Sequence, residues 1–128
     1  MNRILAVLLI TLAATAAADG ADAPEDYALH CSACHGLDGT GLGFVPTLHG
    51  LQPLLAAPGG RAYLARVPGV AQAPLSDERL ARLLNWVLVR FSDTWVEPPY
   101  ATAEVGRLRA SPLRDPAASR PGRAAGSP

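Results

Sequence analysis

The sequence contains no lysine, no excess of either charge and, apart from Met1, no methionine. Its 128 residues include 11 basic and 11 acidic side chains, so the formal net charge is zero. A balanced charge gives none of the strongly basic surface that proteins use to bind nucleic acid, and we expect no nucleic-acid partner. The missing lysine and methionine also narrow the set of side chains from which a ligand site can be built.

Strand patterns and aromatic side chains are scarce as well. No stretch alternates apolar and polar residues over a useful length, so we predict an all-α fold. The length allows one small domain, and only 5% of the residues are aromatic. A core of that kind is marginal unless something further stabilises it.

The N-terminus has the pattern of a secretory signal peptide. Arg3 supplies a positive charge, residues 4–12 form an apolar stretch, and the alanines at 16–18 offer a small-residue cleavage site. We therefore predict a signal peptide over residues 1–18 and a periplasmic or otherwise exported mature chain, with no membrane span after cleavage. An uncleaved membrane anchor is the alternative, although the apolar stretch is short for a bilayer.

Four segments are predicted to be helical. The clearest is residues 75–91, where Ser76 suits the N-cap and six apolar residues recur at helical spacing. These six residues are Leu80, Leu83, Leu84, Val87, Leu88 and Phe91. Shorter helices are expected at residues 25–34, 61–67 and 102–110.

The glycine-rich residues 36–46 are expected to form a loop. From about residue 100 the composition shifts toward proline, alanine and arginine without any hydrophobic period. We therefore place the folded domain at residues 19–99 and a C-terminal extension at residues 100–128. The extension begins with the last short helix and is predicted to continue as a disordered tail.

The sequence His-Cys-Ser-Ala-Cys-His-Gly at residues 30–36 contains the only two cysteines of the chain. In a Cys-x-x-Cys-His motif, the thiols bond covalently to the two vinyl groups of haem and the histidine binds the iron. On a helix, Cys31 and Cys34 face the same way, and His35 follows directly. The motif predicts one covalently attached haem c with His35 as an axial ligand, and the porphyrin would supply the apolar surface that the small core lacks.

Three other interpretations of the motif fit less well. A thioredoxin-like redox pair needs βαβ units, which the sequence lacks. A structural zinc site needs four ligands at suitable spacing, and the three ligands of the motif would have to be joined by the distant His49. A plain disulfide, the usual fate of an exported cysteine pair, leaves His35 without a role.

Residues 24–92 resemble a class I monohaem cytochrome c. Four features carry the resemblance. They are Tyr27 four residues before Cys31, the attachment motif itself, the stretch Val-Pro-Thr-Leu-His-Gly at residues 45–50, and a C-terminal helix that contains Trp86.

The resemblance implies three to five short helices wrapped around one covalently attached haem. It also implies that Tyr27 packs against Trp86, as part of the cofactor site. A third implication is that the carbonyl of Pro46 accepts a hydrogen bond from Nδ1 of His35. Such a bond fixes the tautomer of the imidazole and raises its donor strength.

Members of this family that carry electrons usually bind the far side of the iron with a methionine from the loop before the last helix. Here that loop is residues 66–76, and it contains no methionine. We take His49 or Gln72 as candidates for the sixth ligand, and an open or water-bound iron facing an apolar pocket as the alternative. Asn85, a tyrosine, the mature N-terminus and a residue of a partner protein are further alternatives, whereas His30 adjoins the motif and cannot reach that side.

Two functions from different classes follow. The first is an electron carrier that passes single electrons between periplasmic redox-partner proteins. The second is a haem protein whose open distal site binds carbon monoxide, nitric oxide or peroxide, as a sensor or a peroxidase-like enzyme. We favour the carrier, because no recognisable motif places the acid–base group that peroxidase chemistry requires. A third interpretation makes the chain a subunit of a larger oxidoreductase.

Overall fold

The computed structural model describes residues 22–122 of the chain. The predicted signal peptide, residues 1–18, therefore lies outside the described residues, as does the end of the predicted tail. All regular structure in the described part is helical, which confirms the prediction of an all-α fold. None of the helices between residues 22 and 122 is long and apolar enough to cross a membrane.

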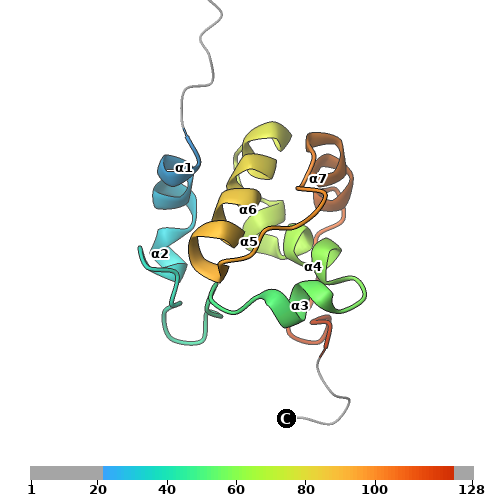
Figure 1. Ribbon diagram of the computed structural model, residues 1–128, viewed down its shortest axis with the longest axis horizontal. Coiled ribbons are helices and arrows are strands. Elements are labelled where there is room, and N and C mark those ends of the chain that lie inside the picture. The colour runs from blue at the N-terminus through green and yellow to red at the C-terminus, as the bar shows by residue number, and fades with distance from the viewer. Residues whose placement is uncertain (1–21, 123–128) are drawn as a thin grey trace, which may run out of the picture.

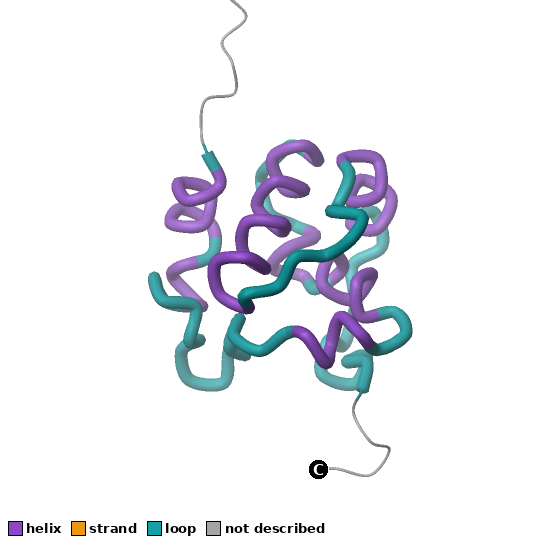
Figure 2. The backbone as a smooth tube through the Cα atoms, viewed as in Figure 1, coloured by secondary structure: helices purple, strands orange, loops and turns teal. Residues whose placement is uncertain are grey.

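Seven helices occur within residues 22–122. They are α1 (Ala23–His30), α2 (Ser32–His35), α3 (Gln52–Ala56), α4 (Gly60–Arg66), α5 (Pro68–Ala71), α6 (Asp77–Ser92) and α7 (Thr102–Arg109). The number exceeds the three to five that the resemblance implies because α2, α3 and α5 are short turns of four or five residues. Helix α6 packs against both α1 and α7, and α1 and α2 lie on the opposite side of it from α7 (Figures 1 and 2).

Helices α1 and α2 replace the single helix predicted over residues 25–34. The carboxylate of Asp22 caps α1 by accepting a hydrogen bond from the N–H of Glu25 (3.0 Å). The backbone leaves the α conformation at Cys31, where φ is −124°. Helix α2 then ends at Gly36, whose positive φ of 74° suits glycine. The chain passes from there into the glycine-rich loop.

Helix α6 supplies the central apolar face, as its sequence period predicts. Its N-cap is Ser76, whose hydroxyl oxygen accepts a hydrogen bond from the N–H of Arg79 (3.2 Å). The six apolar residues named above are all buried. Asp26 on α1 is only 1% exposed and forms an ion pair with Arg79, so the α1–α6 contact includes a buried charge pair beside its apolar packing.

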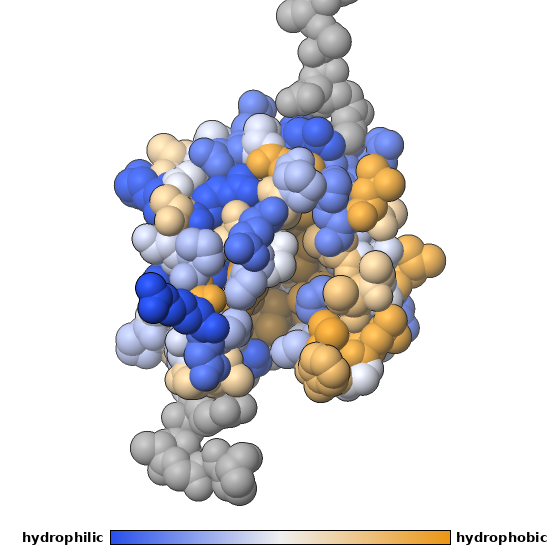
Figure 3. All heavy atoms as spheres, turned by 180° about the vertical axis from the view of Figure 1, so that it is seen from behind, coloured by the Kyte–Doolittle hydropathy of each residue, from blue (hydrophilic) through white to orange (hydrophobic). Residues whose placement is uncertain are grey.

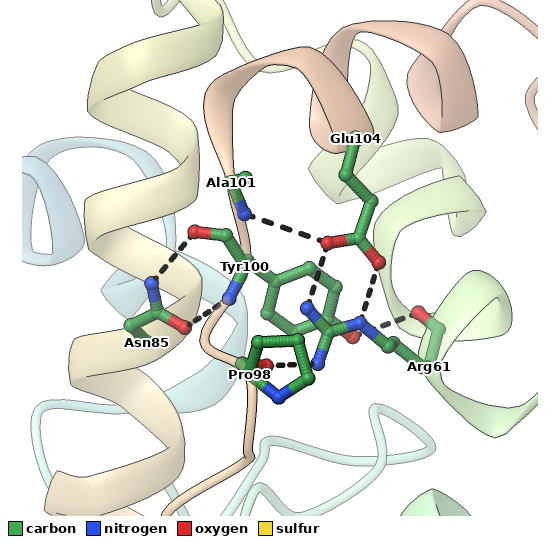
Figure 4. Close-up of polar contacts among 6 residues, drawn as sticks. All are labelled: Arg61, Asn85, Pro98, Tyr100, Ala101 and Glu104. Atoms are coloured by element: carbon green, nitrogen blue, oxygen red, sulfur yellow. Dashed lines mark hydrogen bonds and ion pairs between the residues drawn. The ribbon is translucent and has the colours of Figure 1, made fainter.

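The chain from Tyr100 onward belongs to the same core. The side-chain amide of Asn85 accepts a hydrogen bond from the N–H of Tyr100 (2.9 Å) and donates one to its carbonyl (3.0 Å) (Figure 4). The Tyr100 hydroxyl donates to the carbonyl of Arg61 (2.7 Å), and the guanidinium of Arg61 binds Glu104 (2.7 Å). Tyr100 and Val105 are 3% and 0% exposed, so the packing shows no break at the predicted domain boundary.

Residues 111–122, here called the C-terminal segment, follow α7 and lie against the body of the protein. The carbonyl of Arg66 accepts a hydrogen bond from the N–H of Leu113 (2.8 Å), and the Arg66 guanidinium donates to the carbonyl of Ser111 (2.7 Å). The prediction of a disordered tail is therefore wrong for this segment. Backbone groups hold it in place, and they need no hydrophobic period; residues 123–128 lie outside the described part.

Candidate functional site

A cavity of about 290 Å³ separates α2 from α4 and α5. Its volume lies close to the lower end of the range of about 300–1,000 Å³ that is usual for small-molecule and cofactor sites. The side chains around it are predominantly apolar, and Figure 3 shows an apolar hollow on the face opposite to that of Figure 1. The apolar face of α6 forms one wall with the side chains of Leu80, Leu83, Leu84, Val87 and Leu88.

The motif at α2 forms a second wall, because Cys31, Cys34 and His35 all line the cavity. Both cysteines are free thiols. Burial raises the pKa of Cys31 to about 11, and the nearby Asp26 and Cys34 act in the same direction. Cys31 is therefore a protonated thiol at neutral pH, whereas metal binding by cysteine requires the thiolate. The motif presents two thiols and an imidazole to one apolar space.

The ring of His35 is held by the loop that follows α2. Its Nδ1 atom lies 3.0 Å from the carbonyl oxygen of Pro46, the contact that the resemblance implies. Since a carbonyl only accepts hydrogen bonds, Nδ1 carries the proton and Nε2 keeps its lone pair. Burial lowers the pKa of His35, and the hydrogen bond to Pro46 opposes that shift without reversing it. The site therefore offers a neutral imidazole, the form that binds metal ions.

The glycine-rich loop bonds back to α2 and so fixes the carbonyl of Pro46. The N–H of Gly41 donates to the carbonyl of His35 (2.9 Å). Gly41 has a φ of +84°, and a Cβ there would lie 2.3 Å from the carbonyl oxygen of Val45 and 3.0 Å from that of Pro46. Only glycine fits at this position without moving the loop.

An aromatic cluster lies behind the motif. Tyr27 and Trp86, predicted to be partners, have ring centroids 5.6 Å apart. Phe91 completes the cluster, 4.8 Å from Tyr27 and 5.6 Å from Trp86. Tyr27 also borders the cavity, and its hydroxyl donates to the carbonyl of Gly36 (2.6 Å), whereas Trp86 is not among the residues that line the cavity. Trp86 thus packs α6 against α1 through its contact with Tyr27.

The wall opposite α2 is apolar. It is built from Leu64 on α4, from Val67 and Val70 at α5, and from Ala73. Arg109 on α7 restrains the chain after α5 by donating hydrogen bonds to the carbonyls of Ala71 (2.9 Å) and Leu75 (2.7 Å). Residues 66–76, where the resemblance would place a methionine ligand, therefore present an apolar surface that Arg109 restrains.

Neither predicted candidate for a sixth ligand borders the cavity. Nε2 of His49 lies 2.8 Å from the carbonyl oxygen of Asp38, and its ring stands edge-on to Phe91 at 6.0 Å. Gln72 is exposed at the C-terminal end of α5. The imidazole of His49 contacts the glycine-rich loop and Gln72 is exposed, so the structure brings neither to the cavity that Cys31, Cys34 and His35 border. Asn85 is engaged by Tyr100, as described above.

Much of the lining was not predicted from the sequence. It includes Tyr63 on α4 and two residues of the C-terminal segment, Pro116 and Arg120. Tyr63 is 8% exposed and its hydroxyl donates to the carbonyl of Pro116 (3.0 Å). The composition of the tail gave no signal for these contacts, since the acceptor is a backbone carbonyl.

No protein-family model matches the chain, and a search of the curated proteins finds no match. Within residues 22–122, no group of three or more His, Cys, Asp or Glu side chains is arranged to hold a metal ion by itself.

Proposed function

We propose that the chain is an exported monohaem c-type cytochrome, which transfers single electrons between redox-partner proteins. One observation carries the proposal. Two thiols and a neutral imidazole border the same apolar cavity, and Pro46 holds the imidazole in the tautomer that leaves Nε2 available. Haem c would be bound covalently through Cys31 and Cys34, with His35 as the axial ligand.

The residues of the cavity fit this cofactor in their chemistry. Neither cysteine is engaged in a disulfide, as addition to the vinyl groups of haem requires. The remaining walls are apolar side chains from α4, α5 and α6, which match the faces of a porphyrin. The small core also gains the apolar surface that its few aromatic residues do not provide.

When bound, the haem supplies an iron that gains or loses one electron. The residues of the chain determine how that site behaves. The carbonyl of Pro46 raises the donor strength of His35, and the apolar walls exclude water from the site. Arg109 and the glycine-rich loop hold the two sides of the cavity fixed. A fixed site favours electron transfer, because few atoms must move when the charge changes.

A second function, the binding of small ligands by a sensor or a peroxidase-like enzyme, is favoured by the apolar wall opposite α2. In the described part of the chain, the side chains that α5 contributes to the cavity contain no iron-binding atom. An iron held by His35 alone would leave that side accessible to carbon monoxide or peroxide.

The test combines mass spectrometry, absorption spectra and stopped-flow kinetics on the purified mature protein. If the protein is an electron carrier, we expect its mass to exceed that of the polypeptide by one haem. We also expect a second, ferric c-type cytochrome to oxidise the ferrous protein much faster than peroxide does. His35→Ala should change the spectrum of the attached haem. The matched variant His49→Ala should leave it unchanged, because His49 does not border the cavity.

Two results would contradict the proposal. A mass without haem would exclude a c-type cytochrome altogether. A ferrous spectrum that shifts with carbon monoxide, together with rapid peroxide turnover and no electron exchange with the other cytochrome, would support the second function instead.

A further inference from the structure

Arg120 is the one arginine that lines the cavity in the described part of the chain. It also borders a second hollow, which it lines together with Gly50, Pro53 and Leu54. Among residues 22–122, no acidic side chain forms an ion pair with Arg120, whereas Arg61, Arg79 and Arg109 each have one. The cavity is thus bordered by an arginine that has no acidic partner among the described residues.

The segment that carries Arg120 is fixed to the wall of the cavity. Tyr63 binds the carbonyl of Pro116 (3.0 Å), and Pro116 itself lines the cavity. The carboxylate of Asp115 caps the next turn by accepting a hydrogen bond from the N–H of Ala118 (2.9 Å). The position of Arg120 is therefore set by structured chain on its N-terminal side.

The positions of the two covalent bonds to Cys31 and Cys34 would determine which edge of the haem faces Arg120. Haem carries two vinyl groups on one edge and two carboxylate-bearing substituents on the opposite edge. The thiols of Cys31 and Cys34 would hold the vinyl edge at α2. The C-terminal segment ends beside α3, on the side of the molecule away from α2 (Figure 1).

We propose that Arg120 binds the carboxylate groups of the haem, which makes the C-terminal segment part of the cofactor site. The inference rests on the proposed function, because it needs the haem at α2. A guanidinium matches a carboxylate with two parallel hydrogen bonds, and such charge-assisted pairs are among the strongest polar contacts in proteins. The pair would supply the missing counter-charge on both sides, since an unpaired carboxylate next to an apolar cavity is costly.

The test compares Arg120→Ala with Arg114→Ala in the holoprotein. Arg114 belongs to the same segment but is exposed and does not line the cavity, so its loss removes the same charge at a different place. Removing a cation near the iron stabilises the ferric form. We therefore expect Arg120→Ala to shift the redox equilibrium about tenfold toward the ferric form, which lowers the midpoint potential by about 59 mV for a one-electron couple. Arg120→Lys should restore most of the shift, and Arg114→Ala should change the potential little.

Equal midpoint potentials for Arg120→Ala and Arg114→Ala, in proteins that both carry haem, would overturn the inference and leave the proposed function intact. If Arg120→Ala fails to fold, two other variants test the inference. An unchanged midpoint potential in Arg120→Lys together with a lowered one in Arg120→Gln would support it, and equal potentials in both variants would overturn it. If the mass of the purified protein is that of the polypeptide alone, with no haem, both the proposed function and this inference are overturned.

Discussion

The protonation state of Glu104 makes the stability of the fold depend on pH. Its carboxylate binds the guanidinium of Arg61, and this hydrogen bond is the main reason why the pKa of Glu104 lies below its usual value. A carboxylate whose pKa is lower in the folded than in the unfolded chain stabilises the fold above its unfolded pKa, about 4.3, and loses this effect as the pH falls through the folded value. We expect Glu104→Gln to lower the free energy of unfolding by about 1 kcal/mol at pH 7.

Urea unfolding at pH 7 and at pH 3 measures this effect. The difference in the free energy of unfolding between wild type and Glu104→Gln should shrink toward zero as the pH approaches 3. Glu97→Gln serves as the control, because Glu97 is exposed and its carboxylate binds only the neutral ring N–H of Trp95 (3.2 Å). A constant difference between pH 3 and pH 7 would show that the ion pair with Arg61 is not the source of the stabilisation.

Contacts of single residues were predictable only where a motif specifies both partners. The resemblance named the pair of His35 and Pro46 and the pair of Tyr27 and Trp86, and both lie in contact. In the sequence, Asp26 is simply one of two acidic residues early in a helix. In the structure it is buried against Arg79, 53 residues away, and no local pattern records a partner at that distance.

The loop between α2 and α3 depends on glycine at one position more than at another. Gly41 and Gly43 both have positive φ, 84° and 58°. A Cβ at Gly41 would collide with the carbonyl of Val45, whereas a Cβ at Gly43 would have no atom within 4 Å. We expect Gly43→Ala to cost about 1 kcal/mol for its backbone conformation alone, and Gly41→Ala to cost about 3 kcal/mol because the loop must also shift.

Thermal unfolding of the two variants measures this difference, and NMR of the His35 ring reports whether the Nδ1 proton keeps its bond to Pro46. The bond should weaken in Gly41→Ala and persist in Gly43→Ala. Similar losses of stability in both variants would mean that the loop adapts to a side chain at Gly41.

Helices were predictable in proportion to their length and to the clarity of their caps. The helix predicted at residues 75–91 is α6, which begins after the expected cap Ser76 and buries the expected face. The break between α1 and α2 was not predicted, because it lies in the backbone of Cys31 and leaves no compositional mark. Helices α3 and α5 span only about one turn, too short for a hydrophobic period to be visible.

For the molecule as a whole, the last part of the described chain decides whether the core closes. A chain that ends at residue 99 would lack Tyr100 and Val105, which are almost completely buried. Each buried side chain of this size contributes about 1.5–3 kcal/mol, and the polar network around Arg61 would be lost as well. That sum is comparable to the whole stability of a small domain, about 5–15 kcal/mol. We therefore expect this chain not to unfold cooperatively.

A chain that ends at residue 110 is the matched comparison, since it keeps α7 and loses only the C-terminal segment. Circular dichroism during thermal unfolding should show a cooperative transition for this chain, at a lower midpoint than for the full-length protein. Cooperative unfolding of the chain that ends at residue 99 would mean that the domain boundary predicted from composition is correct after all.

The composition gives no sign of the packing that continues past that boundary, for a physical reason. Proline, alanine and arginine form no apolar face, so the sequence after α7 resembles an unfolded segment. Its hydrogen bonds run to Tyr63 and Arg66 through backbone carbonyls and N–H groups, which every residue possesses. The same limitation applies to the far wall of the cavity: the sequence shows that residues 66–76 contain no methionine, but only the fold shows that neither His49 nor Gln72 borders the cavity.

The location of Pro116 and Arg120 on the cavity has a consequence for the order of events in biosynthesis. An exported chain crosses the membrane from its N-terminal end, so under the proposed function Cys31, Cys34 and His35 reach the far side before the C-terminal segment does. During that interval the cavity lacks its last wall and is open to a bulky molecule. Under the proposed function, the haem would be attached to Cys31 and Cys34 first. The C-terminal segment would then pack over the cavity and enclose the bound haem.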